Sequence, residues 1–282
     1  MATPTLPELA PPCGHDTAGL RAEGHRLRCA SCGSFFDRGS LAQDFVYDAS
    51  YPVDRSHFDP EMGAMKVRSL ERWLRAVNVD PTGRVVCEVG FGGGHCLRWL
   101  AERAAQALGI EAVEANLEHA RGLGLTNLLR FADCREPLPR PVDLWLFLDS
   151  FEHLLEPARF LRWLVASSAP GARVLVVAPE AGSASERWLG RLWPHRLPDH
   201  RFHWSRVGLE ALYRAHGFRK VAEFRPTKAV SGAMVVNHLS RTLPLLLPLA
   251  GTARWFGRIR LDFNLGEMGL VLERGASNGD PG

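Results

Sequence analysis

Residues 85–94 decide the fold and read Val85-Val-Cys-Glu88-Val-Gly90-Phe-Gly92-Gly-Gly94. An apolar run typical of a strand leads into a glycine-rich turn, and a helical segment that begins near His95 follows the turn. Glycine is needed there because the backbone bends sharply and approaches a ligand so closely that a Cβ atom would block it. The turn amides and the helix N-terminus then face the ligand. The stretch therefore predicts a nucleotide site at the end of a buried strand.

From Arg84 onward, short β-rich runs alternate with helical stretches, which predicts a parallel sheet with helices on both faces. The expected strands are Val85–Val89, Ala107–Glu111, Leu128–Phe131, Leu144–Leu148, Arg173–Ala178, Val221–Phe224 and Gly269–Leu272. The expected helices are Met62–Val77, His95–Arg103, Leu117–Gly122, Pro157–Ser167 and Arg206–His216. Residues 226–266 interrupt the alternation and are too long for a simple hairpin, so we expect them to carry helices of their own.

These patterns divide the chain into four segments. Residues 1–45 are expected to hold a flexible lead-in and a small unit rich in Cys, His and Gly, and residues 46–83 an N-terminal helical cap. Residues 84–225 form the expected nucleotide-binding core. Residues 226–282 are expected to contain a helical insertion or lid, the final strand and a tail.

The spacing of the glycines separates two classes of nucleotide-binding protein. A dinucleotide-binding turn has Gly or Ala at the sixth position of its motif, whereas Gly90-x-Gly92 reaches His95 there. Here the glycines fall at every second residue after an acid, Glu88. This pattern resembles the first motif of class I S-adenosylmethionine-dependent methyltransferases of the small-molecule (UbiG-like) type. The resemblance implies a doubly wound α/β fold with a seven-stranded Rossmann-like sheet whose last strand is antiparallel.

Further motifs of that family follow in order along the chain. Glu111 ends the second strand, where the family has its ribose-binding acid, and Asp133-Cys134 resembles the segment that meets the adenine. Glu152-His153 resembles a pair common in small-molecule methyltransferases. The resemblance implies an S-adenosylmethionine site made of Glu88, Gly90, Gly92, Gly94, Glu111, Asp133, Cys134 and Asp149. Taken singly, Glu111 is also typical of a solvent-facing acid and Asp133 of a turn, so the ordered set carries the prediction.

Three cysteines cluster near the N-terminus, in Cys13-Gly-His15 and Cys29-Ala-Ser-Cys32. Thiols and imidazoles are ligands that zinc accepts in a closed tetrahedral site. The arrangement resembles the zinc-ribbon-like N-terminal unit of some sugar and natural-product methyltransferases, which implies a structural zinc ion. The expected ligands are Cys13, His15, Cys29 and Cys32. Asp16 and His25 are the other candidates for the fourth position, and an unmetallated loop is the alternative interpretation.

Histidines gather after the expected fourth and fifth strands, on the side where α/β sheets bind ligands. His153 leaves the fourth strand, and His200 and His203 lie in the segment Leu197-Pro-Asp-His-Arg-Phe-His-Trp204. Histidine accepts a proton near neutral pH, and a base is needed only where the methyl acceptor starts protonated. These three histidines are the candidate catalytic bases, and for each of them a capping or packing role is the alternative.

The amino-acid composition limits the classes of partner that the protein is expected to bind. A formal net charge of +3 over 282 residues is too small to favour nucleic acid. No apolar run reaches the roughly 20 residues that span a bilayer, and the N-terminus lacks a secretory pattern, so we expect a cytoplasmic protein, monomeric or homodimeric. Residues 228–261 are basic, contain no acid and include the apolar run 243–250, which would suit an anionic membrane surface. Pro244 and Pro248 favour packing within the protein instead.

The resemblance implies transfer of a methyl group from S-adenosylmethionine to oxygen, nitrogen or carbon of a small molecule, such as a natural product, a sugar or a lipid-linked intermediate. Two alternatives belong to other classes. One is a nucleotide-binding scaffold or interaction protein without turnover, because a fold does not fix a function. The other is a nicotinamide-dependent oxidoreductase, which His95 disfavours.

Overall fold

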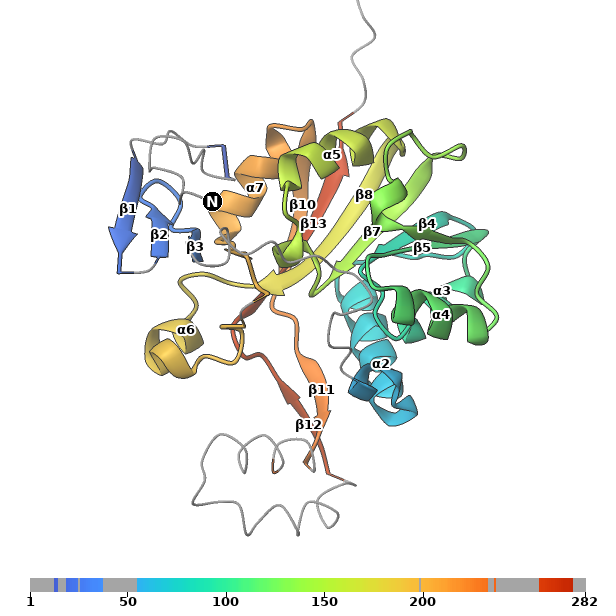
Figure 1. Cartoon of the computed structure of the whole chain (residues 1–282), viewed down its shortest axis with the longest axis horizontal. Coiled ribbons are helices and arrows are strands. Elements are labelled where there is room, and N and C mark those ends of the chain that lie inside the picture. The colour runs from blue at the N-terminus through green and yellow to red at the C-terminus, as the bar shows by residue number, and fades with distance from the viewer. Residues whose placement is uncertain are drawn as a thin grey trace, which may run out of the picture.

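A seven-stranded sheet forms the centre of the computed structural model, which describes residues 13–14, 19–24, 26–37, 55–197, 199–232, 236 and 259–275 (Figure 1). Its strands are β4 (Val85–Val89), β5 (Gln106–Glu111), β6 (Leu128–Arg130), β7 (Val142–Leu148), β8 (Ser168–Pro179), β10 (Phe218–Phe224) and β13 (Glu267–Arg274). They lie in the order β10-β13-β8-β7-β4-β5-β6. The pairs among β8, β7, β4, β5 and β6 are parallel, and β13 is antiparallel to both of its neighbours. The expected fold class, including the antiparallel last strand, is confirmed.

Every expected strand of this sheet is present, and β8 shows why some are longer than the pattern suggested. β8 begins at Ser168 rather than Arg173, although Pro170 and Gly171 interrupt the β-rich run. The pairing between β7 and β8 shifts register between Val142 and Leu144, where the chain of β8 bulges. Such a bulge tolerates proline and a glycine with φ of 72°, so the strand continues through residues that look like a turn.

The helices cover both faces of the sheet (Figure 1). They are α2 (Pro60–Ala76), α3 (His95–Ala101), α4 (Glu114–Gly122), α5 (Pro157–Ala166) and α7 (Arg206–Arg214), whereas α6 (Ala184–Leu189) lies away from the sheet. Short 3-10 turns are η3 (Arg55–Phe58), η4 (Phe131–Asp133), η5 (Phe151–His153) and η6 (Gly190–Leu192). One buried cluster joins α2, α3 and α4 to one face, and a second joins α5 and α7 to the other. Alternate residues of β4 enter the two clusters, as expected for a strand buried on both faces.

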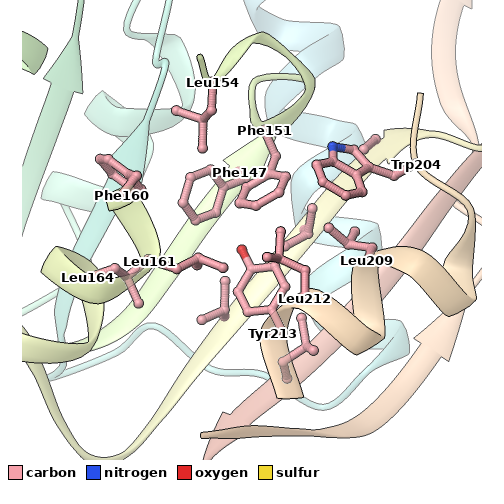
Figure 2. Close-up of a cluster of buried hydrophobic side chains, with 14 of the residues drawn as sticks. Phe147, Phe151, Leu154, Phe160, Leu161, Leu164, Trp204, Leu209, Leu212 and Tyr213 are labelled. Carbon is pink, nitrogen blue, oxygen red and sulfur yellow. The ribbon is translucent and has the colours of Figure 1, made fainter. Parts of the chain in front are cut away.

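Aromatic side chains dominate the core beneath α5 and α7 (Figure 2). Phe151 of η5 lies between Phe147 of β7 and Tyr213 of α7, with ring centroids 5.2 and 5.3 Å away. Both Phe147 and Phe151 are fully buried. This packing holds the loop that leaves β7, so the polar residues on either side of Phe151 have fixed positions.

The N-terminal unit is joined to the core through a shared sheet. Strands β1 (Leu20–Glu23), β2 (Arg26–Cys29) and β3 (Phe35–Asp37) pair in that order. β3 also pairs antiparallel with β9 (Phe202–His203), which belongs to the histidine-rich segment. The Phe35 ring stacks on the His203 ring at 4.4 Å. The sequence predicted neither this pairing nor β9, because strands of two or three residues leave little pattern to detect.

A two-stranded ribbon leaves the sheet near α2. Its strands are β11 (Lys228–Ser231) and β12 (Arg260–Phe263). They lie near the two ends of residues 226–266, the segment in which we expected helices. The expected helices between them fall on residues 233–235 and 237–258, which lie outside the described residues, as do 1–12 and 38–54. Trp73 of α2 donates its indole N–H to the Thr227 carbonyl at 3.0 Å, which anchors the ribbon.

Within the part of the chain that the structure describes, no helix is long and apolar enough to cross a membrane.

The packing of α2 on α3 depends on Gly63. A Cβ atom at this position would overlap the His95 ring at the start of α3. We therefore expect Gly63→Ala to destabilise the protein by about 1–3 kcal/mol, the usual cost of overpacking. Gly122→Ala is the control, because a Cβ atom there meets nothing within 4 Å. Thermal denaturation should show a lower Tm for Gly63→Ala and an unchanged or higher Tm for Gly122→Ala. Equal melting temperatures would contradict the packing described here.

Candidate active site

The glycine turn after β4 lies against the exit of β7. Gly90 and Gly92 have φ of 73° and 53°, in the left-handed region that glycine adopts without strain. A Cβ atom at Gly90 would lie 2.5 Å from Cβ of Ser150, so only glycine allows this approach. Ser150 in turn donates its hydroxyl to the Val89 carbonyl at 2.6 Å. The two strand ends are thereby held side by side. Gly94 (φ 74°) precedes the first residue of α3.

A cavity of about 330 Å³ lies beneath this turn. Its walls come from α2, the glycine turn, the end of β7 and the start of β11. Glu88, Gly90, Gly92 and Asp149 of the expected cofactor site line it. Lys66 of α2 and Lys228 of β11, which the cofactor prediction did not include, line it as well.

Glu88 is the acid most deeply placed in this wall. It is 3 % exposed, and its Oε2 has no hydrogen-bond partner among the described residues. Burial, only partly opposed by the charge of Lys66, raises the pKa of Glu88 to about 8. A buried carboxyl oxygen without a partner requires a donor, and the ammonium of an amino-acid moiety is one. The site therefore fits the methionine part of S-adenosylmethionine.

Glu111 lies at the end of β5 and accepts three backbone N–H groups. Its Oε2 accepts from Gly92 at 2.9 Å, and its Oε1 accepts from Ala112 at 2.7 Å and Val113 at 3.0 Å. The carboxylate thus holds the glycine turn in place. Its expected contact with a ribose stays a prediction.

Asp133 and Cys134 lie at the end of η4 and are not among the residues that line the cavity. Burial raises the pKa of the Cys134 thiol to about 12, so this side chain is neutral at pH 7. Contact of these two residues with an adenine ring stays a prediction.

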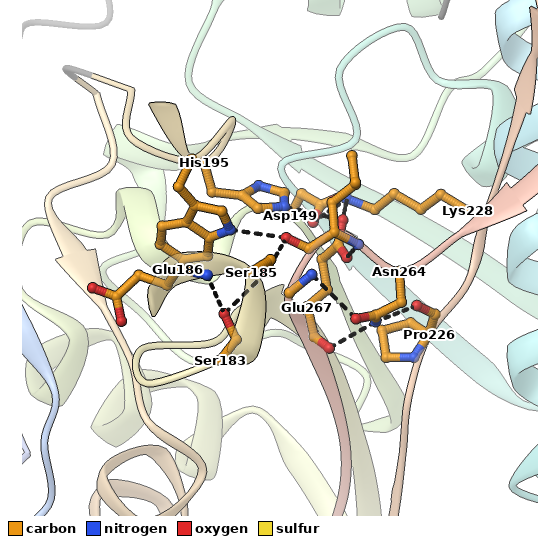
Figure 3. A network of polar contacts seen from close by, with 12 residues as sticks. Asp149, Ser183, Ser185, Glu186, His195, Pro226, Lys228, Asn264 and Glu267 are labelled. Carbon is orange, nitrogen blue, oxygen red and sulfur yellow. Dashed lines mark hydrogen bonds and ion pairs between the residues drawn. The ribbon is translucent and has the colours of Figure 1, made fainter. Parts of the chain in front are cut away.

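A chain of ion pairs extends from the cavity to the histidine-rich segment (Figure 3). Lys228 lies 2.8 Å from Oδ2 of Asp149 and 3.1 Å from Oε1 of Glu267. His195 approaches the same Glu267 oxygen at 3.1 Å. Asp149 has φ of 56°, which is unusual for a residue with a side chain and shows that its surroundings hold it in place.

The charged groups in this series of ion pairs stabilise one another's charged forms. Burial alone would lower the pKa of Lys228, but Asp149 and Glu267 outweigh it and raise that pKa above its usual value. Burial alone would raise the pKa of Glu267, but the bond from His195 and the charge of Lys228 lower it to about 2. Lys228 and Glu267 are therefore both charged at pH 7. In the sequence, Lys228 is only one residue of a basic stretch. Its ion pairs could not be predicted, because its partners lie far away along the chain.

The three candidate histidines come together at the edge where β7 and β8 end. Ring centroids lie 4.8 Å apart for His153 and His200, and 5.9 Å apart for His200 and His203. Burial lowers the pKa of His200 to about 2 and that of His203 to about 4, so both are neutral at pH 7. His203 is fully buried and His200 is 5 % exposed, whereas the side chain of His153 keeps 23 % of its exposure. Of the three, His153 is thus the most open to an acceptor.

The three N-terminal cysteines also meet. The sulfur atoms of Cys13, Cys29 and Cys32 lie within 4.8 Å of one another. A hydrogen bond with Cys13 is the largest cause that lowers the pKa of Cys32 to about 4, so this thiol ionises readily. The three candidates for a fourth ligand, His15, Asp16 and His25, lie outside the described residues.

The cysteine unit rests on the N-terminus of α7. Ser34 accepts the backbone N–H of Ser205, the N-cap of α7, at 3.0 Å. A Cβ atom at Gly208 would lie 2.9 Å from Sγ of Cys32, so the first turn of the helix approaches the cysteines closely. The sequence did not predict this contact between residues so distant in the chain.

Comparison with known proteins agrees with the fold. A family model described as "Methyltransferase domain" matches residues 64–223, more than half of the chain. The protein therefore belongs to this family and is an S-adenosylmethionine-dependent methyltransferase, as the ordered motifs predicted.

A curated relative, the ubiquinone biosynthesis O-methyltransferase of Bordetella bronchiseptica, is 28% identical over 109 residues, which are 36% of this chain and 45% of that protein. The match thus spans less than half of the relative's length. Among solved structures, the YcgJ protein of Bacillus subtilis is 14% identical with a TM-score of 0.52 over 75% of this chain and 99% of its own. An S-adenosylmethionine-dependent methyltransferase of Aquifex aeolicus is 16% identical with a TM-score of 0.50, over 78% and 95%. These two likenesses concern the fold alone.

Replacement of Glu88 tests its place in the cofactor site. Glu88→Gln should weaken binding of S-adenosylhomocysteine by roughly tenfold to a hundredfold, because a hydrogen bond to a charged group contributes about 1.5–3 kcal/mol. With a pKa of about 8, Glu88 of the ligand-free protein is protonated at pH 7 and must lose its proton to pair with an ammonium. Wild-type affinity should therefore rise from about pH 6 to pH 8, and that of Glu88→Gln should not.

Calorimetric titration at several pH values measures both effects. Glu118→Gln, which removes an exposed carboxylate from α4, is the matched control. Equal affinities and equal pH dependence in wild type and Glu88→Gln would show that Glu88 does not hold the ligand.

Proposed function

We propose that this methyltransferase acts on a small molecule, methylates an oxygen atom of it, and binds it at the end of β7 beside His153. The observation that carries the proposal is the continuity of the β7 exit loop. Asp149 of this loop lines the cavity that Glu88 also lines, and His153 follows four residues later, in contact with the histidine-rich segment. In this proposal, one loop would therefore contact the methyl donor and also carry the group that accepts a proton.

In this proposal the methionine end of the cofactor occupies the cavity, with its ammonium on Glu88. Lys66 and Lys228 are the cations available for its carboxylate. Glu111, Asp133 and Cys134 would hold the nucleoside end, as the family resemblance implies. The bound cofactor supplies an activated methyl group.

Two observations support a small acceptor. The formal net charge of +3 does not favour nucleic acid. The curated relative is named as an O-methyltransferase of ubiquinone biosynthesis. Much of the catalysis would then be positioning, which contributes up to roughly 7–11 kcal/mol when the reacting atoms are held in line. His153 would take the proton of an acceptor hydroxyl, because its ring is partly exposed and its Nδ1 is held by the Asp199 carbonyl at 2.9 Å.

Transfer of a radioactive methyl group tests the proposal and excludes a scaffold without turnover. The purified protein is incubated with methyl-labelled S-adenosylmethionine and either a low-molecular-weight metabolite extract or the protein and nucleic acid fractions of the same cells. We expect label in the metabolite fraction, with loss of that label in Glu88→Gln at limiting cofactor. Label confined to macromolecules would refute the small acceptor, and an absence of transfer to every fraction would favour the scaffold.

We further propose that Cys13, Cys29 and Cys32 hold a structural zinc ion, with His15 as the expected fourth ligand. Such a closed site has no open position for a substrate. The three buried or half-buried thiols lie together, and a unit with so little core gains stability from a metal. The ion would fix the loop between β2 and β3, which rests on the N-terminus of α7.

Replacement of one cysteine tests the zinc site. Cys29→Ser should lower the zinc content by one equivalent per chain, because a closed site rarely survives the loss of a thiolate ligand. Cys134→Ser is the control, since this cysteine lies far along the chain at η4. Elemental analysis by mass spectrometry after dialysis measures the content. The same zinc content in both variants would refute the site.

A further inference from the structure

One face of the ribbon formed by β11 and β12 is apolar and exposed. Leu261 and Phe263 alternate along β12, and Ile259 and Leu265 continue the alternation on either side of the strand. Each of these four residues is between 36 % and 44 % exposed. An extended strand rises about 3.3 Å per residue, so the row from Ile259 to Phe263 spans roughly 13 Å. A contiguous exposed apolar patch of this kind marks a binding surface.

The polar residues between them attach the ribbon to the rest of the protein. Asp262 forms an ion pair with Arg72 of α2 at 2.8 Å. Asn264 donates its side-chain amide to the Pro226 carbonyl at 2.6 Å. The ribbon is thus held to α2 and to the segment before β11 through polar groups, and the apolar row has no part in these contacts.

The apolar face begins at the cofactor cavity. Phe263 is paired with Lys228 of β11, and paired residues of antiparallel strands project to the same face. Lys228 lines the cavity and lies 2.8 Å from Asp149. Asp262, the neighbour of Phe263, lies on the opposite face, toward α2. The apolar row therefore leads away from the cavity on the side of the ribbon turned from α2.

α6 and η6 add exposed apolar side chains at this end of the molecule (Figure 1). Trp188 is 90 % exposed, and Leu192 is exposed as well. The chain after β12 is bound to this segment, because Ser185 donates its hydroxyl to the Leu265 carbonyl at 2.8 Å and Trp193 donates its indole N–H to the same oxygen at 2.8 Å. Figure 1 shows the ribbon between α6 and α2, so the face turned from α2 is the one nearer α6.

A series of polar contacts joins the base of the ribbon to the candidate catalytic base. Glu267 contacts both Lys228 and His195, at 3.1 Å each. The His195 and His200 rings are stacked with centroids 6.3 Å apart, and the His200 and His153 rings lie 4.8 Å apart. One molecule bound across this series would present a polar end to His153 and an apolar end to β12.

We propose that the methyl acceptor is an amphiphilic small molecule, with a hydroxylated head beside His153 and an extended apolar chain on the exposed face of β12. This inference rests on the proposed methyl transfer and adds the class of acceptor to it. The chain of an acceptor is favoured over a bilayer or a second copy of the protein, because the apolar face is continuous with the cavity that Lys228 lines. Leu261 and Phe263 are then specificity-determining residues, since they contribute contact area only to an acceptor that has the chain.

Calorimetric titration with para-alkylphenols of increasing chain length, from para-cresol to para-octylphenol, tests the assignment on the full-length protein saturated with S-adenosylhomocysteine. The affinity of wild type should rise roughly twofold to fourfold per methylene group, because each one leaves water for apolar surface. Phe263→Ser should flatten this rise and leave the affinity for para-cresol unchanged. Val207→Ser, which removes an exposed apolar side chain from α7, is the matched control and should behave as wild type.

Phe263 is exposed, so its replacement should leave the fold intact, and the Tm verifies this. Leu261→Ser is a second variant with the same expected result. An affinity that does not rise with chain length, or that rises equally in Phe263→Ser and the control, would refute the chain site. The same holds if none of the alkylphenols binds.

Two further measurements identify the other occupants. With flat affinities, co-sedimentation with phosphatidylglycerol-containing vesicles that is lost in Phe263→Ser would assign the face to a bilayer. With flat affinities, a dimer in sedimentation velocity that Phe263→Ser converts to a monomer would assign the face to a second copy. Either result would overturn the proposal.

Methyl transfer is measured separately, so that the two proposals fail in different ways. Chain-length-dependent binding without transfer of methyl groups to any acceptor would refute the proposed function and not the chain site. Transfer to small molecules with flat affinities would refute the chain site and not the proposed function.

Discussion

The contact between Gly90 and Ser150 is the constraint on which the site depends. Two parallel strands end side by side in any doubly wound sheet, but the polar residues after them share a cavity only if their loops approach closely. A glycine with φ of 73° against Ser150, together with the 2.6 Å bond from Ser150 to Val89, provides that approach. Any residue with a Cβ atom at position 90 would separate the cavity wall that bears Glu88 from the loop that bears Asp149.

Buried charges then connect this cavity to the acceptor side. Lys228 reaches from β11 to Asp149 and Glu267, and Glu267 binds His195. Breaking a partly buried ion pair costs free energy, because removal of one charge leaves the other without a partner. The ribbon of β11 and β12, the end of β7 and the histidine-rich segment are thus held as one unit, and each ion pair restrains the others.

The sequence predicted what depends on local pattern and missed what depends on distant contacts. β4 and the Gly90 turn were predicted closely, since a buried strand and left-handed glycines have a strong signature. The prediction ended α3 at Arg103, two residues beyond its observed end at Ala101, because helix ends carry weaker signals. No local signal reveals that Phe35 pairs with His203, or that Lys228 pairs with Asp149, because these partners are far apart along the chain.

We infer that the turn after β4, with Glu88 beneath it, binds the sulfonium nucleotide S-adenosylmethionine rather than a dinucleotide. Calorimetric titration of the wild-type protein with S-adenosylmethionine, S-adenosylhomocysteine and NAD tests this claim most directly. The structure predicts saturable one-to-one binding of the first two and no measurable heat with NAD. Binding of NAD, with no binding of either methionine nucleotide, would contradict it.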